Sequence, residues 1–279
     1  MRTACLFLRK SLALRLTLER LELTVAARKS KTIPGCVRPY LLTIWRYFKP
    51  PSLASLPVWR QGVIWIGRIF AVKVGFFGSL ILLFIVINPP SNIYMTYENW
   101  RNGGISHHWV QFDAIAPVAA RSVVAAEDAN YCLHWGFDMK AIRQALAKGG
   151  KRGASTLSQQ VVKNVFLWQG RSWLRKALEA TLTPMIELFW SKRRILEIYL
   201  NIAEFDDGVF GIEAAAEHYF GISAAKLSSL QAARLAAVLP NPKERNAVKP
   251  TTFLRKRTAK IIQGAETINQ DGRAACFQN

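Results

Sequence analysis

The stretch VIWIGRIFAVKVGFFGSLILLFIVI, residues 63–87, decides how the chain is organised. Residues 74–87 carry no charge, and only Lys73 interrupts the nineteen residues that begin at Ile69. At a rise of about 1.5 Å per residue, a helix of that length measures ~28 Å, close to the hydrocarbon thickness of a bilayer. Lys73 and Arg68 lie near one end, where long side chains can reach the membrane surface. The following NPPSN ends the helix, so the sequence predicts a transmembrane anchor over 63–87.

Two other structures would fit this apolar run: a buried core helix and a cleaved signal peptide. The core helix is the weaker interpretation, because Leu, Ile, Phe and Val surround the segment on all faces. A signal peptide would be followed by a small-residue cleavage site of the A-x-A kind, but none follows, and about sixty residues precede the run. A retained anchor is therefore favoured.

The positive charge is unevenly distributed along the chain. The 279 residues contain 38 Lys and Arg against 18 Asp and Glu, a formal net charge of +20, which is typical of proteins that bind polyanions. Residues 1–73 hold fourteen of these bases and only two acids, Glu19 and Glu22. By the positive-inside rule this end stays in the cytoplasm, and residues 88–279 lie outside. Membrane topology thus explains much of the charge, and no nucleic-acid partner is expected.

The segment before the anchor, residues 1–62, is a basic N-terminal extension with an expected place in the cytoplasm. Its stretch RKSLALRLTLERLEL, residues 9–23, could form a basic amphipathic helix on the inner leaflet. It could equally be an extension without function, and this second interpretation is favoured.

After residue 100 the sequence shows helical periodicity and no alternating runs of strand length, which predicts an all-helical exported domain. Asp113 and Asp138 are expected to cap two of the helices, and Thr156 with Gln159 matches a capping box. Pro184 is expected to kink the longest helix. The expected helices cover 113–127, 138–148, 155–167, 172–190, 191–203, 211–220 and 228–239.

These elements divide the part after the anchor into three segments. Residues 88–112 are expected to be a linker and the start of the exported domain. Residues 113–262 are expected to form the body of that domain, which is a usual size for one domain. Residues 263–279 are expected to be a C-terminal tail.

The chain has four cysteines, and their spacing is typical of neither a disulfide framework nor a metal site. They are Cys5, Cys36, Cys132 and Cys276. Isolated thiols are the favoured interpretation, and a bridge between Cys132 and Cys276 stays open.

Two adjacent acids stand out in AAEDANYCLHWG, residues 125–136. An apolar run leads directly to Glu127 and Asp128, and His134 and Gly136 follow among aromatic residues. A solvated surface would scatter acids among its many bases, and a core would exclude them. The pair is therefore a candidate for chemistry.

The stretch GASTLSQQVVKN, residues 153–164, contains a helix start whose free backbone N–H groups suit an anion. Polar side chains gather on one side of the helix that follows, namely Gln159, Gln160, Lys163 and Asn164. Alone, this pattern fits an ordinary capped surface helix.

The stretch RSWLRKALEATL, residues 171–182, places Arg175 and Glu179 one helical turn apart. Arg171, Lys176 and the earlier Lys163 bring the number of cations near this carboxylate to four, which is typical of an anion site. In KRRILEIYLN, residues 192–201, Glu197 and Asn201 also lie one turn apart, on the polar side of an apolar helix.

Four motifs occur in a recognisable order: E-D-x₂-Y-x₂-H-x-G (127–136), G-A-S-T-L-S-Q-Q-x₂-K-N (153–164), R-K-x₂-E (175–179) and K-x₂-I-L-E-x-Y-L-N (192–201). The series strongly resembles the peptidoglycan glycosyltransferases, which polymerise lipid II, and it covers about residues 100–260. Tyr131 stands where that family more often has Phe, and it keeps the aromatic ring. SAAK at 223–226 fits a transpeptidase pattern by chance, but no K-T-G follows, so the chain resembles the monofunctional biosynthetic type.

The resemblance implies a role for each matched residue. Glu127 would be the base that acts on the acceptor 4-hydroxyl. Glu179 would be the second catalytic carboxylate, which orients cations, assists the leaving group or helps to hold a divalent ion. The diphosphate would be bound by Lys163, Arg171, Arg175 and Lys176. The substrate site would also include Thr156, Gln159, Gln160 and Asn164. Motif residues with structural roles would be Asp128, His134, Gly136, Lys192, Glu197, Tyr199 and Asn201.

The resemblance also implies the fold and the setting: an all-α, lysozyme-like glycosyltransferase domain behind a single N-terminal transmembrane helix. The expected partners are lipid II, the growing glycan lipid and the membrane, with other cell-wall synthesis proteins as further candidates. No cofactor is required, although Mg²⁺ or Mn²⁺ could take part. The expected location is the inner membrane, with one span, a cytoplasmic N-terminus and a periplasmic catalytic domain.

Two rival functions stay open: a hydrolytic or lytic muramidase, and a membrane-anchored binding protein without catalysis. The cation cluster argues against the muramidase, because cleavage of a neutral glycan needs no group of bases aimed at a leaving group.

The stretch VFLWQGRSWL, residues 165–174, has aromatic and apolar residues around basic ones. It is expected to dip into the outer face of the membrane, as interfacial Trp residues do. Ordinary core aromatics are an equally weighted interpretation.

Overall fold

The computed structural model describes residues 57–147, 149, 155–170 and 172–278. The chain separates into two compact units, residues 1–71 and residues 72–279. The expectations for residues 1–56, for Arg171 and for Cys5 and Cys36 therefore lie outside the described residues.

The predicted anchor forms α4, a helix over Val58–Leu83. Among the described residues it is the one helix long and apolar enough to cross a membrane. Its side chains are almost all exposed, and only Ile81 is fully buried. A core helix would bury its apolar side chains, so that interpretation is wrong, and α4 fits a membrane-anchored protein.

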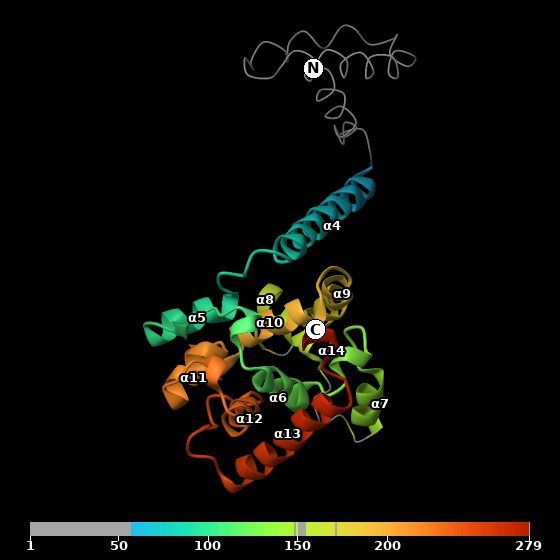
Figure 1. Cartoon of the computed structure of the whole chain (residues 1–279). Coiled ribbons are helices and arrows are strands. Elements are labelled where there is room, and N and C mark those ends of the chain that lie inside the picture. The colour runs from blue at the N-terminus through green and yellow to red at the C-terminus, as the bar shows by residue number, and fades with distance from the viewer. Residues whose placement is uncertain (1–56, 148, 150–154, 171, 279) are drawn as a thin grey trace, which may run out of the picture. The chain divides into compact units, whose positions relative to one another are not determined.

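The rest of the described chain is mostly helical, as predicted (Figure 1). Its helices are α5 (Ile93–Asn102), α6 (Pro117–Glu127), α7 (Met139–Ala147), α8 (Leu157–Phe166), α9 (Trp173–Phe189), α10 (Lys192–Ile202), α11 (Ile212–Phe220), α12 (Ser229–Val238), α13 (Thr252–Gln270) and α14 (Ala275–Gln278). Short 3₁₀ turns cover Phe112–Ala114, Tyr131–Leu133 and Ala224–Lys226.

Several helix starts follow local capping chemistry, but the start of α6 differs from the expectation. Asp138 accepts a hydrogen bond from the Ala141 N–H at 2.8 Å, and Thr156 forms the predicted capping box with Gln159. Asp113 was expected to cap the helix that contains Glu127, which is wrong: Asp113 lies in a 3₁₀ turn, and α6 begins at Pro117. Proline suits the first helical position because it has no N–H to satisfy there.

The C-terminal segment differs from the expectation. Helix α13 runs across the expected boundary at residue 262, and residues 263–278 are part of the domain and not a tail. Leu254, Ile261, Ile268 and Phe277 are buried in the core. Helix α5 likewise occupies part of the segment expected to be a linker.

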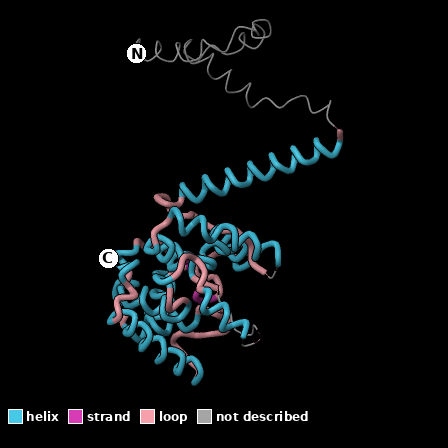
Figure 2. The backbone as a smooth tube through the Cα atoms, turned by 90° about the vertical axis from the view of Figure 1, so that its right-hand side faces the viewer, coloured by secondary structure: helices cyan, strands magenta, loops and turns pink. Residues whose placement is uncertain are grey.

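The domain also contains a small sheet that the sequence did not predict (Figure 2). The strands are β1 (Ser106–His107), β2 (Glu204–Asp206) and β3 (Val209–Phe210), in the order β1-β3-β2. β1 pairs with β3 in parallel, and β2 pairs with β3 antiparallel. Strands of two or three residues are too short to show an alternating pattern.

The core lies between two groups of packed helices. Helices α6, α12 and α13 pack against one another, and α8 packs against both α9 and α10. The α6–α12 contacts are built largely from alanines, including Ala119, Ala120, Ala232 and Ala236, all of which are buried. Small side chains allow helix backbones to approach closely, and the arrangement holds the C-terminal end of α6 beside α13 and α8.

The last turns of α4, within residues 72–279, pack against the domain. The ring of Phe77 lies 6.2 Å from that of Phe166 at the end of α8. The Trp190 indole N–H donates to the Ile81 carbonyl at 2.7 Å. Arg194 on α10 donates to the carbonyl of Phe84 at 3.1 Å and to that of Ile87 at 3.0 Å.

Candidate active site

Glu127 is the last residue of α6, and its side chain is only 13% exposed. The Gln160 amide on α8 donates a hydrogen bond to its carboxylate at 3.0 Å. Burial raises the pKa of the Glu127 carboxyl, and the Gln160 hydrogen bond and the positive charge of Arg257 act in the opposite direction. A largely buried carboxylate with a raised pKa is suited to accept a proton near neutral pH.

The residues after Glu127 form a tightly held loop, residues 128–136, which we call the catalytic loop. Asp128 is buried, and its two oxygens contact the His134 ring nitrogen at 2.9 Å and the Leu157 N–H at 3.0 Å. The Leu157 contact ties the loop to the start of α8. Asp128 therefore connects the loop to His134 and to α8.

Gly136 ends the catalytic loop at a close approach to α9. Its φ is +84°, and an added Cβ would lie 2.6 Å from Thr183 Cγ2. The Thr156 hydroxyl donates to the Gly136 carbonyl at 2.6 Å. A side chain at this position would have to push α9 or α8 away, so only glycine fits.

The cation cluster gathers around Glu179 on α9, a carboxylate that is 3% exposed. Arg175 donates to one of its oxygens at 2.8 Å, and Lys176 pairs with the other. Arg175 also donates to the Gly170 carbonyl at 2.9 Å, which fixes the direction of its guanidinium. One buried carboxylate thus orients two cations toward the same region.

Lys163 on α8 connects this cluster to Glu127. Burial lowers the pKa of its ammonium, while the negative charges of Glu179 and Glu127 both favour the charged form. Arg175 and Lys176 repel it. Lys163 therefore lies within electrostatic reach of both carboxylates.

A cavity of about 290 Å³ opens beside Glu127's partner Gln160 and beside Lys163. Polar side chains supply most of its wall. The residues that line it are Tyr94, Gln160, Lys163, Asn164, Gln169, Tyr199, Ile202, Ala203, Glu204, Leu239, Pro240 and Pro242. Gln160 and Asn164 thus lie where the sequence predicted a substrate site.

Thr156 and Gln159 occupy a different position from the one expected. Both are buried, and their polar groups are engaged in the capping box and, for Thr156, in the bond to Gly136. They hold the start of α8 against the catalytic loop and do not face the cavity. The expected contact of these two side chains with substrate stays a prediction.

The fourth motif, on α10, supports the site from behind. Tyr199 donates to the Gln160 amide oxygen at 3.4 Å. Asn201 is fully buried and exchanges hydrogen bonds with the backbone of Val110 at 2.8 and 2.9 Å. Glu197 pairs with Arg194 at 3.1 Å. Structural roles for these residues stay a prediction, which these contacts support.

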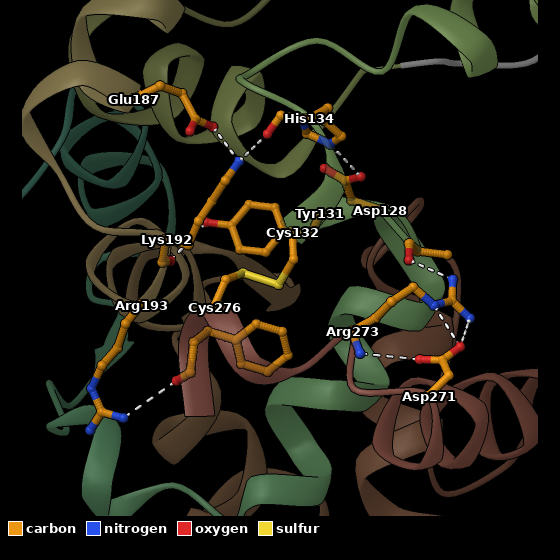
Figure 3. Close-up of a disulfide and its surroundings, with 12 residues drawn as sticks. Asp128, Tyr131, Cys132, His134, Glu187, Lys192, Arg193, Asp271, Arg273 and Cys276 are labelled. Atoms are coloured by element: carbon orange, nitrogen blue, oxygen red, sulfur yellow. Dashed lines mark hydrogen bonds and ion pairs between the residues drawn. A yellow bond between two sulfur atoms is a disulfide. The ribbon is translucent and has the colours of Figure 1, made fainter. Parts of the chain in front are cut away.

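Lys192 begins α10 and fastens the catalytic loop to the end of α9. Its ammonium donates to the His134 carbonyl and to Glu187, both at 2.8 Å, and lies 4.5 Å from the centre of the Tyr131 ring. Figure 3 shows Lys192 between these groups.

With this geometry established, sequence comparison identifies the family. The profile of the Transglycosylase family matches residues 95–266, more than half of the chain. The chain belongs to the transglycosylase family.

Relatives of this transglycosylase share its sequence over most of their own length. It is 60% identical over 206 residues to a biosynthetic peptidoglycan transglycosylase of Jannaschia sp. (strain CCS1), a match that covers 72% of this chain and 86% of that relative. The protein of the same name in Caulobacter vibrioides is 46% identical over 200 residues, with coverage of 70% and 87%. That of Citrobacter koseri is 49% identical over 208 residues, with coverage of 70% and 86%. The family expected from the motifs is confirmed.

The sequence did not indicate two charged residues of the transglycosylase site. Arg257 on α13 lies 3.7 Å from the Glu127 carboxylate and 3.4 Å from the Ala126 carbonyl. Glu187 on α9 is buried, accepts the Ser158 hydroxyl and pairs with Lys192. An acid within an apolar helix was a usable signal for Glu187. No local signal pointed to Arg257, since it reaches Glu127 from a distant helix.

Replacing Arg257 by Met is expected to shift the pH dependence of the transglycosylase. The charge of Arg257 lowers the pKa of Glu127, so its loss raises that pKa. A base works only when deprotonated, and the acid limb of kcat/KM should therefore move to higher pH. The measurement is the rate of lipid II polymerisation from about pH 5 to 9. Arg255→Met, an exposed residue of the same helix, is the matched control, and an unmoved acid limb in Arg257→Met would contradict the assignment.

One group of acids in the described residues has metal-like spacing: Glu98, Glu204 and Asp207, whose oxygens lie within 4.8 Å of one another. The Lys243 ammonium already lies among them, 2.9 Å from Glu98, 3.0 Å from Asp207 and 3.6 Å from Glu204. An ammonium in that position balances their charge, so the group does not fit a divalent ion. A role for Mg²⁺ or Mn²⁺ stays a prediction.

The cysteines differ from the favoured expectation. Cys132 and Cys276 form a disulfide with a Cα–Cα distance of 5.7 Å (Figure 3). The interpretation as isolated thiols is therefore wrong for this pair. Their separation of 144 residues is bridged only in the folded domain, where the C-terminal segment returns to the catalytic loop.

Proposed function

We propose that this transglycosylase polymerises lipid II into the glycan strands of peptidoglycan. It transfers the growing, lipid-diphosphate-linked chain onto the 4-hydroxyl of the GlcNAc of lipid II, with inversion, and releases polyprenyl diphosphate. The observation that carries this function is the pairing of a largely buried carboxylate, Glu127, with a cation cluster, both within electrostatic reach of Lys163. A base and an anion site so arranged suit a hydroxyl acceptor and a diphosphate leaving group.

Glu127 has the role of general base in this reaction. A hydroxyl is a weak nucleophile, so the acceptor needs a group that removes its proton as it attacks. The acceptor oxygen bonds to the anomeric carbon of the donor, the bond from that carbon to the diphosphate oxygen breaks, and Glu127 keeps the proton. The Gln160 hydrogen bond fixes the carboxylate for this step.

The cation cluster has the role of stabilising the leaving group. The diphosphate gains negative charge as its bond breaks, and Lys163, Arg175 and Lys176 offer positive charge there. The resemblance to the family assigns Arg171 to the same role. The guanidinium of Arg175 can bind phosphate oxygens in a bidentate manner. Glu179 holds Arg175 and Lys176 in place, so its role is to position the cations.

The stereochemistry follows from a single displacement. An α-linked donor gives a β-linked product by inversion, without a covalent glycosyl-enzyme intermediate. Inverting glycosidases also use a pair of carboxylates, one of which activates the attacking oxygen. Here the second carboxylate, Glu179, acts through cations, because the diphosphate needs no proton to leave.

The proposed setting is the inner membrane, with a single span, the N-terminus in the cytoplasm and the catalytic domain in the periplasm. The exposed apolar helix α4 and the basic residues before it support this orientation. The Cys132–Cys276 disulfide supports it independently, because disulfides persist in oxidising compartments outside the cytoplasm.

The product analysis of labelled lipid II tests the function. Purified full-length protein in detergent should convert lipid II into longer glycan chains, separated by size. A muramidase would instead shorten pre-formed glycan, and a binding protein would change neither. Repeating the reaction with a chelator tests whether polymerisation requires a divalent cation.

We also propose that the start of α9 touches the outer face of the membrane. Trp173 is 92% exposed and Leu174 is 64% exposed, and Trp168 is partly exposed. Phe166 and Leu167 are buried, so only the second half of the stretch 165–174 is available for lipid. Exposed Trp beside Arg and Lys is typical of a membrane interface.

A fluorophore on the new thiol of Trp173→Cys is expected to be quenched by brominated lipids in proteoliposomes. The background is Cys5→Ser/Cys36→Ser, so that the label reacts only at the new position. The matched control is Phe253→Cys, an exposed position on α13. Quenching several times stronger at position 173 is expected, and equal, weak quenching at both positions would refute the contact.

A further inference from the structure

The end of the chain forms a strap, residues 271–278, that closes over the side of the domain near the catalytic loop. Phe277 is fully buried, and its carbonyl accepts a hydrogen bond from Arg193 at 3.3 Å. The Gln278 amide donates to the Pro117 carbonyl at 3.0 Å and accepts from Arg121 at 3.2 Å. The strap is thus fixed to the starts of α10 and α6, the two helices that flank the catalytic loop.

Three contacts join this strap to the catalytic loop (Figure 3). Cys276 is bonded to Cys132, Arg273 donates to the Ala129 carbonyl at 3.0 Å, and the ring of Phe277 lies 6.3 Å from that of Tyr131. Of these, only the disulfide is covalent. Arg273 also forms an ion pair with the exposed Asp271. Its hydrogen bond to the Ala129 carbonyl is therefore solvent-accessible and contributes little stability.

A displacement of the catalytic loop would reach Glu127, the proposed general base. It starts at the residue after Glu127, and Asp128 ties it to the start of α8, the helix that carries Gln160 and Lys163. Cys132 lies in the 3₁₀ turn between Asp128 and His134, which contact each other at 2.9 Å. A turn free to shift would move both partners of that contact.

We infer that the Cys132–Cys276 disulfide positions the catalytic loop for catalysis, and that its formation from the two thiols makes the enzyme fully active. Both cysteines are half-buried, so a thiol oxidase can reach them. In the reaction the two thiols lose two protons and two electrons to the disulfide of that oxidase, which leaves as a dithiol while the Cys132–Cys276 bond forms. Cys132 and Cys276 are positioning residues, since they act through the loop.

This inference rests on the proposed function, and the test separates the two. The full-length Cys5→Ser/Cys36→Ser protein, whose only thiols are Cys132 and Cys276, is compared in its oxidised, phosphine-reduced and reoxidised forms. The matched control adds Cys132→Ser and Cys276→Ser. For each form, kcat and KM for lipid II are measured well below the melting temperature, and amide hydrogen exchange is followed over residues 128–136 and over α12.

Reduction is expected to lower kcat by about ten- to a hundredfold, since a shift of roughly 1 Å near the chemistry can cost that much. KM is expected to stay within twofold, because Arg175 and Lys176 are held by Glu179 on their own helix and not by the strap. Reoxidation by glutathione disulfide should restore kcat. The cysteine-free control should be slow and insensitive to the phosphine. Exchange should accelerate in residues 128–136 and not in α12.

An unchanged kcat and unchanged exchange after reduction would overturn the inference, and so would an equal phosphine effect on the cysteine-free control. Faster exchange in α12 as well would show general destabilisation and would also overturn it. If the oxidised protein leaves lipid II unpolymerised, the proposed function fails, and the hydrogen exchange of the loop still decides whether the disulfide positions it.

Discussion

Glu127→Gln is expected to lower the rate of lipid II polymerisation by about 10²- to 10⁴-fold, the usual contribution of a general base. Glutamine keeps the size of the side chain and can still bond to Gln160, but it cannot accept the proton of the acceptor hydroxyl. KM should change little, since the acceptor loses no charged partner. The measurement is the initial rate at saturating lipid II.

The fold should survive this change. Burial disfavours the ionised Glu127 carboxylate, so a neutral amide should leave the melting temperature at neutral pH unchanged or higher. Glu266→Gln, on the exposed face of α13, is the matched control and should polymerise at the normal rate. A folded Glu127→Gln protein with wild-type rates would exclude Glu127 as the base.

Lys163→Met is expected to lower kcat/KM by about 10²- to 10³-fold, the range observed when one preorganised group that stabilises developing charge is removed. Methionine fills much of the same space without the charge. The loss should exceed that of a surface lysine, because Lys163 is largely desolvated and interacts with both Glu127 and Glu179. Rates over a range of lipid II concentrations give the two kinetic constants.

The pH profile makes this prediction more specific. Burial lowers the pKa of Lys163, and its positive charge is lost as the pH rises through that lowered value. The wild-type rate should therefore fall at alkaline pH below the titration range of a free lysine. This limb should be missing in Lys163→Met and present in Lys226→Met, an exposed control. An identical alkaline limb in both variants would contradict the role of Lys163.

Local chemistry made part of the fold predictable. Helix α8 was expected at 155–167 and lies at Leu157–Phe166, because its capping box and apolar spacing are both contained in the segment. Helix α13 was missed because the buried positions between Leu254, Ile261 and Ile268 are occupied by the polar Thr258 and the small Ala265, which weaken the apolar pattern. The strands were missed because segments of two or three residues are too short to show an alternating pattern.

Some residues of the candidate site could be predicted from local sequence, and others could not. Motif residues such as Glu127, Lys163 and Glu179 could be named from their order along the chain. Arg257 could not, because it reaches Glu127 through the packing of α13 on α6. The Cys132–Cys276 pair was open for the same reason: its spacing of 144 residues contains no information on which elements meet.

The docking of α4 onto the domain changes what counts as the minimal folding unit. Phe166 and Trp190 bury part of their rings against residues that belong to the anchor, and the Trp190 indole N–H and the Arg194 guanidinium use anchor carbonyls as acceptors. Removal of residues 1–87, made to obtain a soluble catalytic domain, would expose those rings. It would also leave the two hydrogen-bond donors without their acceptors. The end of the anchor therefore serves as scaffold as well as tether, and a piece with a complete interior must include residues 72–87 as well as the rest of the domain.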